Sequence, residues 1–301
     1  MEPAEMFPDI SDSRNWIEVT PIESGLSGER KYHILRTNGS ERLLRVSDIS
    51  RYKRHCENAS FAQFVHERLG FEMNLPIEVA AFRNDTLCYS LYTWVEGEDA
   101  DNKITNLHTP EQVKFGERAG RLLRRIHTLP SPKDILPWDL YFSRRIDELL
   151  GLYHYRVRSS FEGDKQTAGF IERGRTLMEN RPQTALHGDF RSGNLIVTAD
   201  GELAVIDFGR WCWGDPYMDF RCIRRSCTPS FSRGQINGYF DGNIPGDFFP
   251  LMAFYTAVET ISHICAAYNS PDREKMTAAI AFAEKTVTEY DGFETMIPRW
   301  Y

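Results

Sequence analysis

The segment that most constrains the fold is residues 185–207, which interrupts a long helical pattern in the second half of the chain. It reads as two short apolar strands joined by a turn at residues 200–201. A lone hairpin of this size is marginally stable in water, so we expect it to be packed and to have a use. Its ends carry the polar residues: Asp189 and Asn194 precede the first strand, and Asp207 follows the second.

The order of these polar residues resembles the H-x-D-x-x-x-x-N catalytic loop and the D-F-G motif of the kinase fold. Phosphoryl transfer needs a carboxylate that holds and deprotonates the attacking hydroxyl, and oxygen ligands that fix magnesium on the phosphates. The resemblance implies that Asp189 is the catalytic base and that Asn194 and Asp207 bind the metal ion. Two alternatives are a hairpin with incidental acids and a zinc-binding His187. No Cys partner or H-E-x-x-H sequence stands near His187, so we expect its ring to be buried and to brace the loop.

The first third of the sequence reads as a small antiparallel sheet with one helix. Short apolar runs alternate with turns over residues 16–46, and an Asn-Gly pair between two of them is a strong hairpin signal. Residues 52–69 carry apolar side chains on one helical face, and further strands are expected at 77–82 and 87–94. We therefore predict a β-rich, nucleotide-binding lobe over residues 1–96.

The rest of the chain reads as helical. Thr109-Pro110-Glu111-Gln112 combines an N-cap with Pro at N1 and Gln at N3, and an apolar stripe at helical spacing follows. Further helices are expected near 143–155, over 251–268, where the sequence is apolar almost all round, and over 270–290. The predicted fold is α+β and two-lobed. A small antiparallel β lobe with one helix precedes a larger helical lobe, residues 97–301, which carries the catalytic hairpin and the substrate site.

Motifs outside the hairpin extend the resemblance along the chain: Gly214-Asp215-Pro216, then Asp219, an Arg-Ile-His that ends at His127, and Leu-Tyr-Thr-Trp-Val-Glu-Gly at residues 91–97. Over residues 17–301 the chain is similar to the aminoglycoside phosphotransferase family, whose fold is protein-kinase-like. Gly188 stands where protein kinases have the arginine of H-R-D, and no A-P-E sequence follows. A phosphorylation-gated protein kinase is therefore not expected.

The resemblance implies a nucleotide site in the β lobe, with ATP as phosphate donor, GTP as the alternative, and Mg²⁺. Arg45 stands at the strand position where lysine is the commoner residue, and a guanidinium can also grip phosphate oxygens. Its expected partner on the helix is Glu57, with Glu67 as second choice. The alternatives are a solvent-facing arginine and a solvated helix face.

Two further segments are expected at the nucleotide. Ser27 and Gly28 would lie over the phosphates through their backbone N–H groups. Their loop is not G-x-G-x-x-G, and plain turn residues would give the same sequence. By the resemblance, Thr93 and Val95 would offer backbone groups to the adenine edge, whereas an ordinary strand end is the alternative.

The composition limits the partners. The formal net charge of −7 argues against nucleic acid or an anionic membrane. The six cysteines form no C-x-x-C pair, which is typical of free thiols in a reducing compartment. Residues 1–13 do not read as a signal peptide, and we find no apolar run near the roughly 18 residues that span a bilayer. We therefore expect a cytoplasmic protein, and nothing in the sequence indicates an obligate protein partner.

The acceptor is expected to be a polyhydroxylated small molecule that binds in the helical lobe. From residue 234 onward the chain has nine Asp or Glu and four Lys or Arg, which favours a cationic, aminoglycoside-like antibiotic. Acids on helix surfaces also serve solubility alone. The expected substrate contacts are Asp215, Glu259 and Tyr301, while Asp219 is expected to be structural. Two alternatives stay open: a housekeeping kinase for fructosamine, choline, homoserine or methylthioribose, and a nucleotide-binding pseudokinase scaffold. The intact catalytic and metal-binding residues speak against the scaffold.

Overall fold

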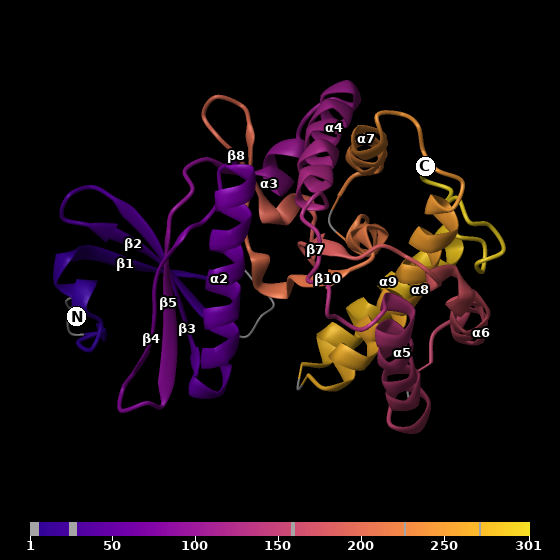
Figure 1. Cartoon of the computed structure of the whole chain (residues 1–301), viewed down its shortest axis with the longest axis horizontal. Helices are drawn as coiled ribbons and strands as arrows, with labels where there is room; N and C mark the ends of the chain where they lie inside the picture. Colours follow the sequence, from indigo (N-terminus) through magenta and orange to yellow (C-terminus); the bar gives the residue numbers. More distant parts are fainter. Residues whose placement is uncertain (1–5, 24–28, 158–159, 226, 271) are drawn as a thin grey trace. The chain divides into compact units, whose positions relative to one another are not determined.

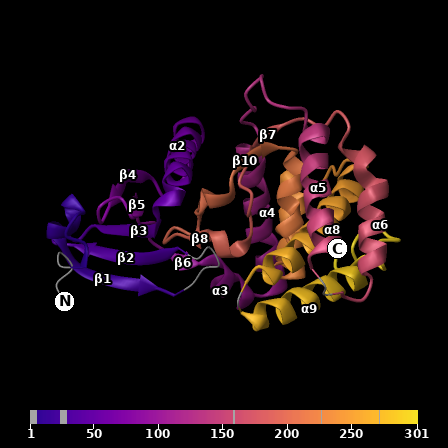
Figure 2. The same cartoon turned by 90° about the horizontal axis from the view of Figure 1, so that it is seen from below.

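The computed structural model describes the chain except for residues 1–5, 24–28, 158–159, 226 and 271. The chain divides into two compact units, which Figures 1 and 2 show from two sides. The sheet unit comprises Met1–Ala100 and Asn194–Trp211, and the helical unit comprises Asp101–Gly193 and Cys212–Tyr301. The hairpin, expected in the helical lobe, therefore groups with the sheet. The functional domains 1–96 and 97–301 stay a prediction.

The sheet unit is built on five antiparallel strands in the order β1-β2-β3-β5-β4. Their bounds are β1 Trp16–Ile22, β2 Arg30–Arg36, β3 Glu41–Asp48, β4 Pro76–Phe82 and β5 Leu87–Thr93. The Asn-Gly pair turns the chain from β2 into β3, and Gly39 has φ +79° there, a conformation that glycine adopts without strain. The strands expected in this part of the sequence are confirmed.

Alternation along β3 separates the two faces of the sheet. Leu44 and Val46 pack into the core of the unit, whereas Arg45 lies on the opposite face because successive side chains of a strand alternate. The predicted helix α2 (Tyr52–Leu69) covers that opposite face (Figure 2). Its buried His55 reaches the Ser47 hydroxyl of β3, with Nε2 and Oγ 2.8 Å apart.

The predicted hairpin consists of β8 (Leu195–Val197) and β9 (Leu203–Val205). The short strand β6 (Glu98–Asp99) pairs with β8 and extends it to a three-stranded sheet in the order β6-β8-β9. The backbone N–H of Val205 also donates to the carbonyl of Glu72, at 3.1 Å. The hairpin is therefore packed against its own unit, as a hairpin of this length requires.

The helical unit surrounds one buried helix, α8, against which α5, α6 and α9 pack (Figure 2). A two-stranded sheet pairs β7 (Thr184–Leu186) with β10 (Cys212–Gly214). Helices α4, α5, α8 and α9 were expected from the sequence, and α3, α6 and α7 were not. The helices are α3 Ala100–Thr105, α4 Thr109–Ile126, α5 Trp138–Tyr155, α6 Asp164–Gly174, α7 Pro229–Phe240, α8 Phe248–Tyr268 and α9 Arg273–Glu289. Short 3₁₀ helices, over both units, are η1 Ser11–Asn15, η2 Ile49–Arg51, η3 Arg175–Met178, η4 Ser192–Asn194, η5 Phe208–Arg210 and η6 Pro216–Cys222.

Helix α8 corrects the expectation that no apolar run is long enough to span a bilayer. By length and composition alone it could cross a membrane, the one such helix among the residues described. In the structure 78% of its most apolar window is buried inside the protein. A core helix passes the same test, so this is weak evidence for a membrane span.

Helices α4 and α7 approach each other closely through glycines. A Cβ atom on Gly120 would lie 2.1 Å from the carbonyl oxygen of Gln235, and one on Gly238 would lie 2.1 Å from that of Glu117. The beginning of α4 corrects the predicted N-cap by one residue. The capping residue is His108, whose N–H donates to the Glu111 carboxylate at 3.3 Å.

Candidate active site

The hairpin of the sheet unit brings two of the expected metal ligands to one end. Asn194 immediately precedes β8, and Asp207 follows β9 by two residues. The backbone N–H of Ile206 donates to the carbonyl of Asn194, at 3.0 Å. Asp207 has φ +63°, a left-handed conformation that is uncommon for residues other than glycine and is often found at functional sites. The sequence predicted this return of Asp207 to the level of Asn194.

Helix α2 anchors the segment that follows Asp207. The ring of Trp211 stacks on that of Phe61, with centroids 4.0 Å apart. The guanidinium of Arg54 donates to the carbonyl oxygens of Gly209 and Trp211, at 3.0 and 3.2 Å. These contacts fix the backbone that follows Asp207, and the hairpin fixes the backbone that precedes it. The position of Asp207 is therefore constrained on both sides along the chain.

Arg45 of β3 reaches the same carboxylate. Its guanidinium lies 3.0 Å from Oδ1 of Asp207 and 2.6 Å from Oε2 of Glu29. Burial alone would lower the pKa of Arg45, but the charges of Asp207 and Glu29 raise it above its usual value. Burial would likewise raise the pKa of Glu29, but the hydrogen bond from His55 and the charge of Arg45 lower it to about 2.

The partner of Arg45 is therefore Glu29, and not Glu57 or Glu67 as expected. Glu57 lies 3.7 Å from Arg54 and 4.0 Å from Lys53, and its side chain is 43% exposed. His55 faces the sheet, and a residue two positions later points about 200° away around a helix. Glu29 precedes β2 and does not lie on a helix. The expectation of a partner on the helix could therefore not identify it.

The other expected nucleotide contacts differ in outcome. Ser27 and Gly28 lie outside the described residues. The N–H of Thr93 donates to the carbonyl of Leu75, and its own carbonyl accepts from Asn74, both at 2.8 Å. The N–H of Thr93 is thus already used, whereas its carbonyl can accept a second hydrogen bond. The adenine contact stays a prediction for this carbonyl and for the backbone of Val95, whose side chain is buried.

In the helical unit, a buried carboxylate shapes the loop that carries Asp189. Asp219 of η6 accepts the backbone N–H groups of His187 and Gly188, at 2.8 and 2.7 Å, and also contacts His127 at 3.1 Å. Burial would raise the pKa of Asp219, but the hydrogen bond with His127 holds it below the usual range. The ring of His187 is buried and accepts the N–H of Asp189 at 3.2 Å. His187 and Asp219 thus have the structural roles that we expected.

Two arginines flank the carboxylate of Asp189. Arg225 lies 3.3 Å and Arg191 lies 3.5 Å from its Oδ1 atom. Arg225 also bonds to Glu259 and His263 of α8. Arg225 was not predicted from the sequence. The signal that could have found it is the group of three arginines, Arg221, Arg224 and Arg225, a few residues after the Gly-Asp-Pro motif.

The structure corrects two of the three expected substrate contacts. Asp215 is fully buried and accepts two hydrogen bonds from Arg181, at 2.7 and 3.1 Å, and one from the hydroxyl of Tyr255 at 2.8 Å. Glu259 is buried and paired with Arg221, at 3.1 Å, as well as with Arg225. Burial would raise the pKa of Glu259, but the charge of Arg221 holds it well below its usual range. Carboxylates paired inside the unit are not placed to bind a substrate ammonium.

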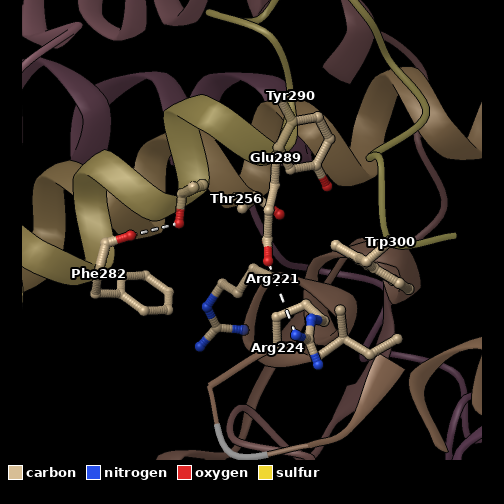
Figure 3. A pocket seen from close by; sticks show the side chains of 9 residues that line it. Arg221, Arg224, Thr256, Phe282, Glu289, Tyr290 and Trp300 are labelled. Atoms are coloured by element: carbon tan, nitrogen blue, oxygen red, sulfur yellow. Dashed lines mark hydrogen bonds and ion pairs between the residues drawn. The ribbon is translucent and has the colours of Figure 1, made fainter. Parts of the chain in front are cut away.

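The third expected contact, Tyr301, donates its hydroxyl to Asn237 of α7, at 3.0 Å, and packs on Phe249. A small pocket lies close to this end of the chain, where Arg224 pairs with Glu289 at 3.8 Å beside Trp300 (Figure 3). Its volume of about 10 Å³ is the room of a single water molecule. This pocket cannot take a polyhydroxylated acceptor without rearrangement.

The donor set at the hairpin fits a hard cation. The described residues contain no group of three or more His, Cys, Asp or Glu side chains that could hold a metal ion. Magnesium, however, is commonly held by one or two protein oxygens together with water and phosphate oxygens. The side-chain oxygens of Asn194 and Asp207 are of that type, so the residues present suit Mg²⁺ bound with a nucleotide.

Comparisons with known proteins agree with this geometry. A model of the phosphotransferase enzyme family matches residues 18–254. No curated protein sequence matches the chain. The family match confirms the resemblance drawn from the motifs and the prediction of a small-molecule phosphotransferase.

Solved structures share the fold over almost the whole chain. The GDP complex of a mutant aminoglycoside 2′-phosphotransferase has a TM-score of 0.72 at 14% identity, with 97% of each chain covered. The streptomycin–ATP–APH(2″)-IIa ternary complex has a TM-score of 0.64 at 17% identity, covering 94% of this chain and 96% of the other. A thermostable mutant of aminoglycoside phosphotransferase APH(4)-Ia, in ternary complex with ADP and hygromycin B, gives 0.66 at 16% identity, with 94% and 96% covered. At such identities these likenesses confirm the α+β, protein-kinase-like fold.

Proposed function

Because the chain belongs to the phosphotransferase enzyme family, we propose that it transfers the γ-phosphate of ATP to a hydroxyl of a small molecule. The observation that carries this proposal is the hairpin, which holds Asn194 and Asp207 at one end, directly after the loop that bears Asp189. GTP is the alternative donor. Residues 1–96 would bind the nucleotide and residues 97–301 the acceptor.

Asp189 orients the acceptor hydroxyl and takes its proton as the oxygen attacks the γ-phosphate. Asp219 and His187 act on it indirectly, because they fix the backbone of its loop. Arg191 and Arg225 contact its carboxylate and help to orient it.

On the nucleotide side, Arg45 grips phosphate oxygens, and Glu29 holds the guanidinium in place. Asn194 and Asp207 would hold Mg²⁺, which neutralises charge on the phosphates when it is bound. We retain the expectation that Ser27, Gly28, Thr93 and Val95 contact the nucleotide, and we no longer expect this of Glu57. The related structures with GDP, ATP and ADP support a nucleotide site of this kind.

For the acceptor we propose an aminoglycoside-like polyhydroxylated cation, whose phosphorylation would confer antibiotic resistance. Support comes from the related complexes with streptomycin and hygromycin B, and not from Asp215 or Glu259, which are buried. The two arginines beside Asp189 favour a second candidate, a metabolite hydroxyl that carries no positive charge. The six free thiols support a cytoplasmic location for either reaction.

The test is an acceptor screen with ATP or GTP and Mg²⁺, read by nucleoside diphosphate release and by the product mass. The panel pairs aminoglycosides with neutral and anionic hydroxyl compounds. We expect acceptor-dependent phosphorylation that falls by about 10²- to 10⁴-fold in Asp189→Asn, the usual worth of a positioned base. Nucleotide affinity of that variant should stay within about twofold. Undiminished turnover in Asp189→Asn would contradict the assigned base, and nucleotide binding without any phosphorylated product would support the scaffold.

A further inference from the structure

Two cations stand directly opposite each other in the sheet unit. Lys31 of β2 and Arg45 of β3 are register partners in the antiparallel pair. Residues in that relation share one face of a sheet, with Cβ atoms about 5 Å apart, and like charges so placed destabilise the pair. An arrangement of this kind calls for an anion between or beside the two side chains.

Both cations point at one carboxylate. The ammonium of Lys31 lies 3.5 Å from Oδ2 of Asp207, and the guanidinium of Arg45 lies 3.0 Å from Oδ1. The side chain of Lys31 is only 16% exposed, which is low for a lysine. Its neighbour Arg30, the first residue of β2, is exposed, and its side chain leaves the strand on the other face.

We propose that Lys31 and Arg45 form a two-cation site for the phosphates of a nucleoside triphosphate. The inference rests on the proposed function, and it adds a binding residue from β2 that the sequence did not indicate. If Asp207 turns its oxygens to a metal ion, both cations lose a shared partner, and phosphate oxygens are the anions that replace it. Arginine offers two parallel N–H donors to phosphate, and lysine offers a mobile point charge.

The alternative is that Lys31 only neutralises Asp207 and has no ligand. The two readings differ in how the loss of Lys31 depends on magnesium. A structural ion pair would act through Asp207, and would therefore weaken ATP only when Mg²⁺ is present. A phosphate-binding lysine would weaken ATP with and without Mg²⁺ and would affect AMP hardly at all. A loss of ATP affinity that vanishes without Mg²⁺ would therefore overturn the ligand role.

The experiment measures binding of AMP, ADP and ATP by titration calorimetry, with Mg²⁺ and again with EDTA. It uses no acceptor, and compares the wild type with Lys31→Gln, Lys31→Arg and the control Arg30→Gln. A hydrogen bond to a charged group contributes about 1.5–3 kcal/mol, so we expect Lys31→Gln to weaken ATP about 10- to 100-fold. Lys31→Arg should recover most of the affinity. AMP binding by Lys31→Gln, and ATP binding by Arg30→Gln, should stay within about twofold of the wild type. The loss should shrink at high salt.

The outcomes separate this inference from the proposed function. A wild type that binds none of the three nucleotides would overturn the proposed function itself. A wild type that binds ATP, together with a folded Lys31→Gln that binds it equally well, would overturn only the two-cation site. Equal losses for AMP and ATP would also overturn it. If Lys31→Gln does not fold, Lys31→Met takes its place. If neither variant folds and Lys31→Arg is stable, Lys31 is a structural cation, and its role as a phosphate ligand is overturned.

Discussion

The ion pair between Glu29 and Arg45 gives a prediction about stability that needs no knowledge of the substrate. In Glu29→Gln the side chain keeps its size but loses its charge. Arg45 then keeps only Asp207 as a carboxylate partner among the contacts described for it. His55, which lies 3.5 Å from Glu29, loses the same negative charge. We therefore expect the variant to fold and to be less stable than the wild type.

The size of the loss follows from the pKa of Glu29, which falls from 4.5 to about 2 in the folded protein. At 1.36 kcal/mol for each pH unit, that corresponds to about 3 kcal/mol. Solvent screening reduces the value, and we expect about 2 kcal/mol. Because the folded pKa is depressed, this stabilisation is fully present above about pH 4.5. It is lost as the pH falls from about 4.5 through 2, because the carboxyl is protonated in both states only below the folded pKa.

Urea unfolding of the wild type and the variant between pH 3 and 8 measures this difference. At neutral pH it should be about 2 kcal/mol, or roughly 3 °C in melting temperature for a chain of this length. The control is Glu57→Gln, which removes the partner expected from the sequence. Its carboxylate is 43% exposed, so the change should stay within about 0.5 kcal/mol. If Glu57→Gln cost more than Glu29→Gln, or if the Glu29→Gln difference did not vary with pH, the ion-pair argument would be refuted.

Two further changes test the helical unit. Asp215→Ala should cost about 3–5 kcal/mol in urea unfolding, because it leaves a buried arginine without its bidentate partner. Asp247 is an exposed carboxylate that pairs with the same arginine, and Asp247→Ala should cost less than about 1 kcal/mol. Equal losses for the two variants would contradict the greater weight given to the buried pair. Gly120→Ala should destabilise by roughly 1–3 kcal/mol, because its Cβ would lie 2.1 Å from the carbonyl oxygen of Gln235. Gly246→Ala meets no atom within 4 Å, and a larger effect there would argue against tight packing of α4 on α7.

The hairpin and the sheet could be predicted because their signals are local. Two apolar runs, an Asp-Gly turn and polar residues at the ends specify where residues 185–207 fold back. The Asn-Gly pair specifies β2 and β3 in the same way. Helix α6 was missed because it is short, with 11 residues, and helix α7 because its sequence lacks a wide apolar stripe. In α7, two glycines and a buried Gln235 face α4, so the interface is made by close backbone contact instead of large apolar side chains.

The ion pairs could not be predicted, because a sequence does not give the rotation of a helix or the register of two strands. Whether Glu57 or His55 faces Arg45 depends on the rotation of α2 about its own axis. Lys31 opposes Arg45 only in the register that the β2–β3 turn sets, and a slip by one residue would turn it to the other face. The catalytic motifs and the structural roles of His187 and Asp219 could be predicted, whereas the ion-pair partners Glu29, Lys31 and Arg225 could not.

The surplus of acids after residue 234 shows why a charge count does not locate a binding site. Of the nine acids counted there, four pair with arginines that precede residue 234 and were outside the count. The pairs are Asp241 with Arg124, Asp247 with Arg181, Glu259 with Arg221 and Arg225, and Glu289 with Arg224. The surplus therefore overstates the negative charge that a ligand would meet. Near Asp189 the local field is set by the charges in direct contact, because interactions at 3 to 4 Å outweigh charges beyond a Debye length of about 10 Å. These charges include Arg191 and Arg225, and Glu259 in turn pairs with Arg225. The count of acids after residue 234 therefore does not decide whether an acceptor near Asp189 is a cation.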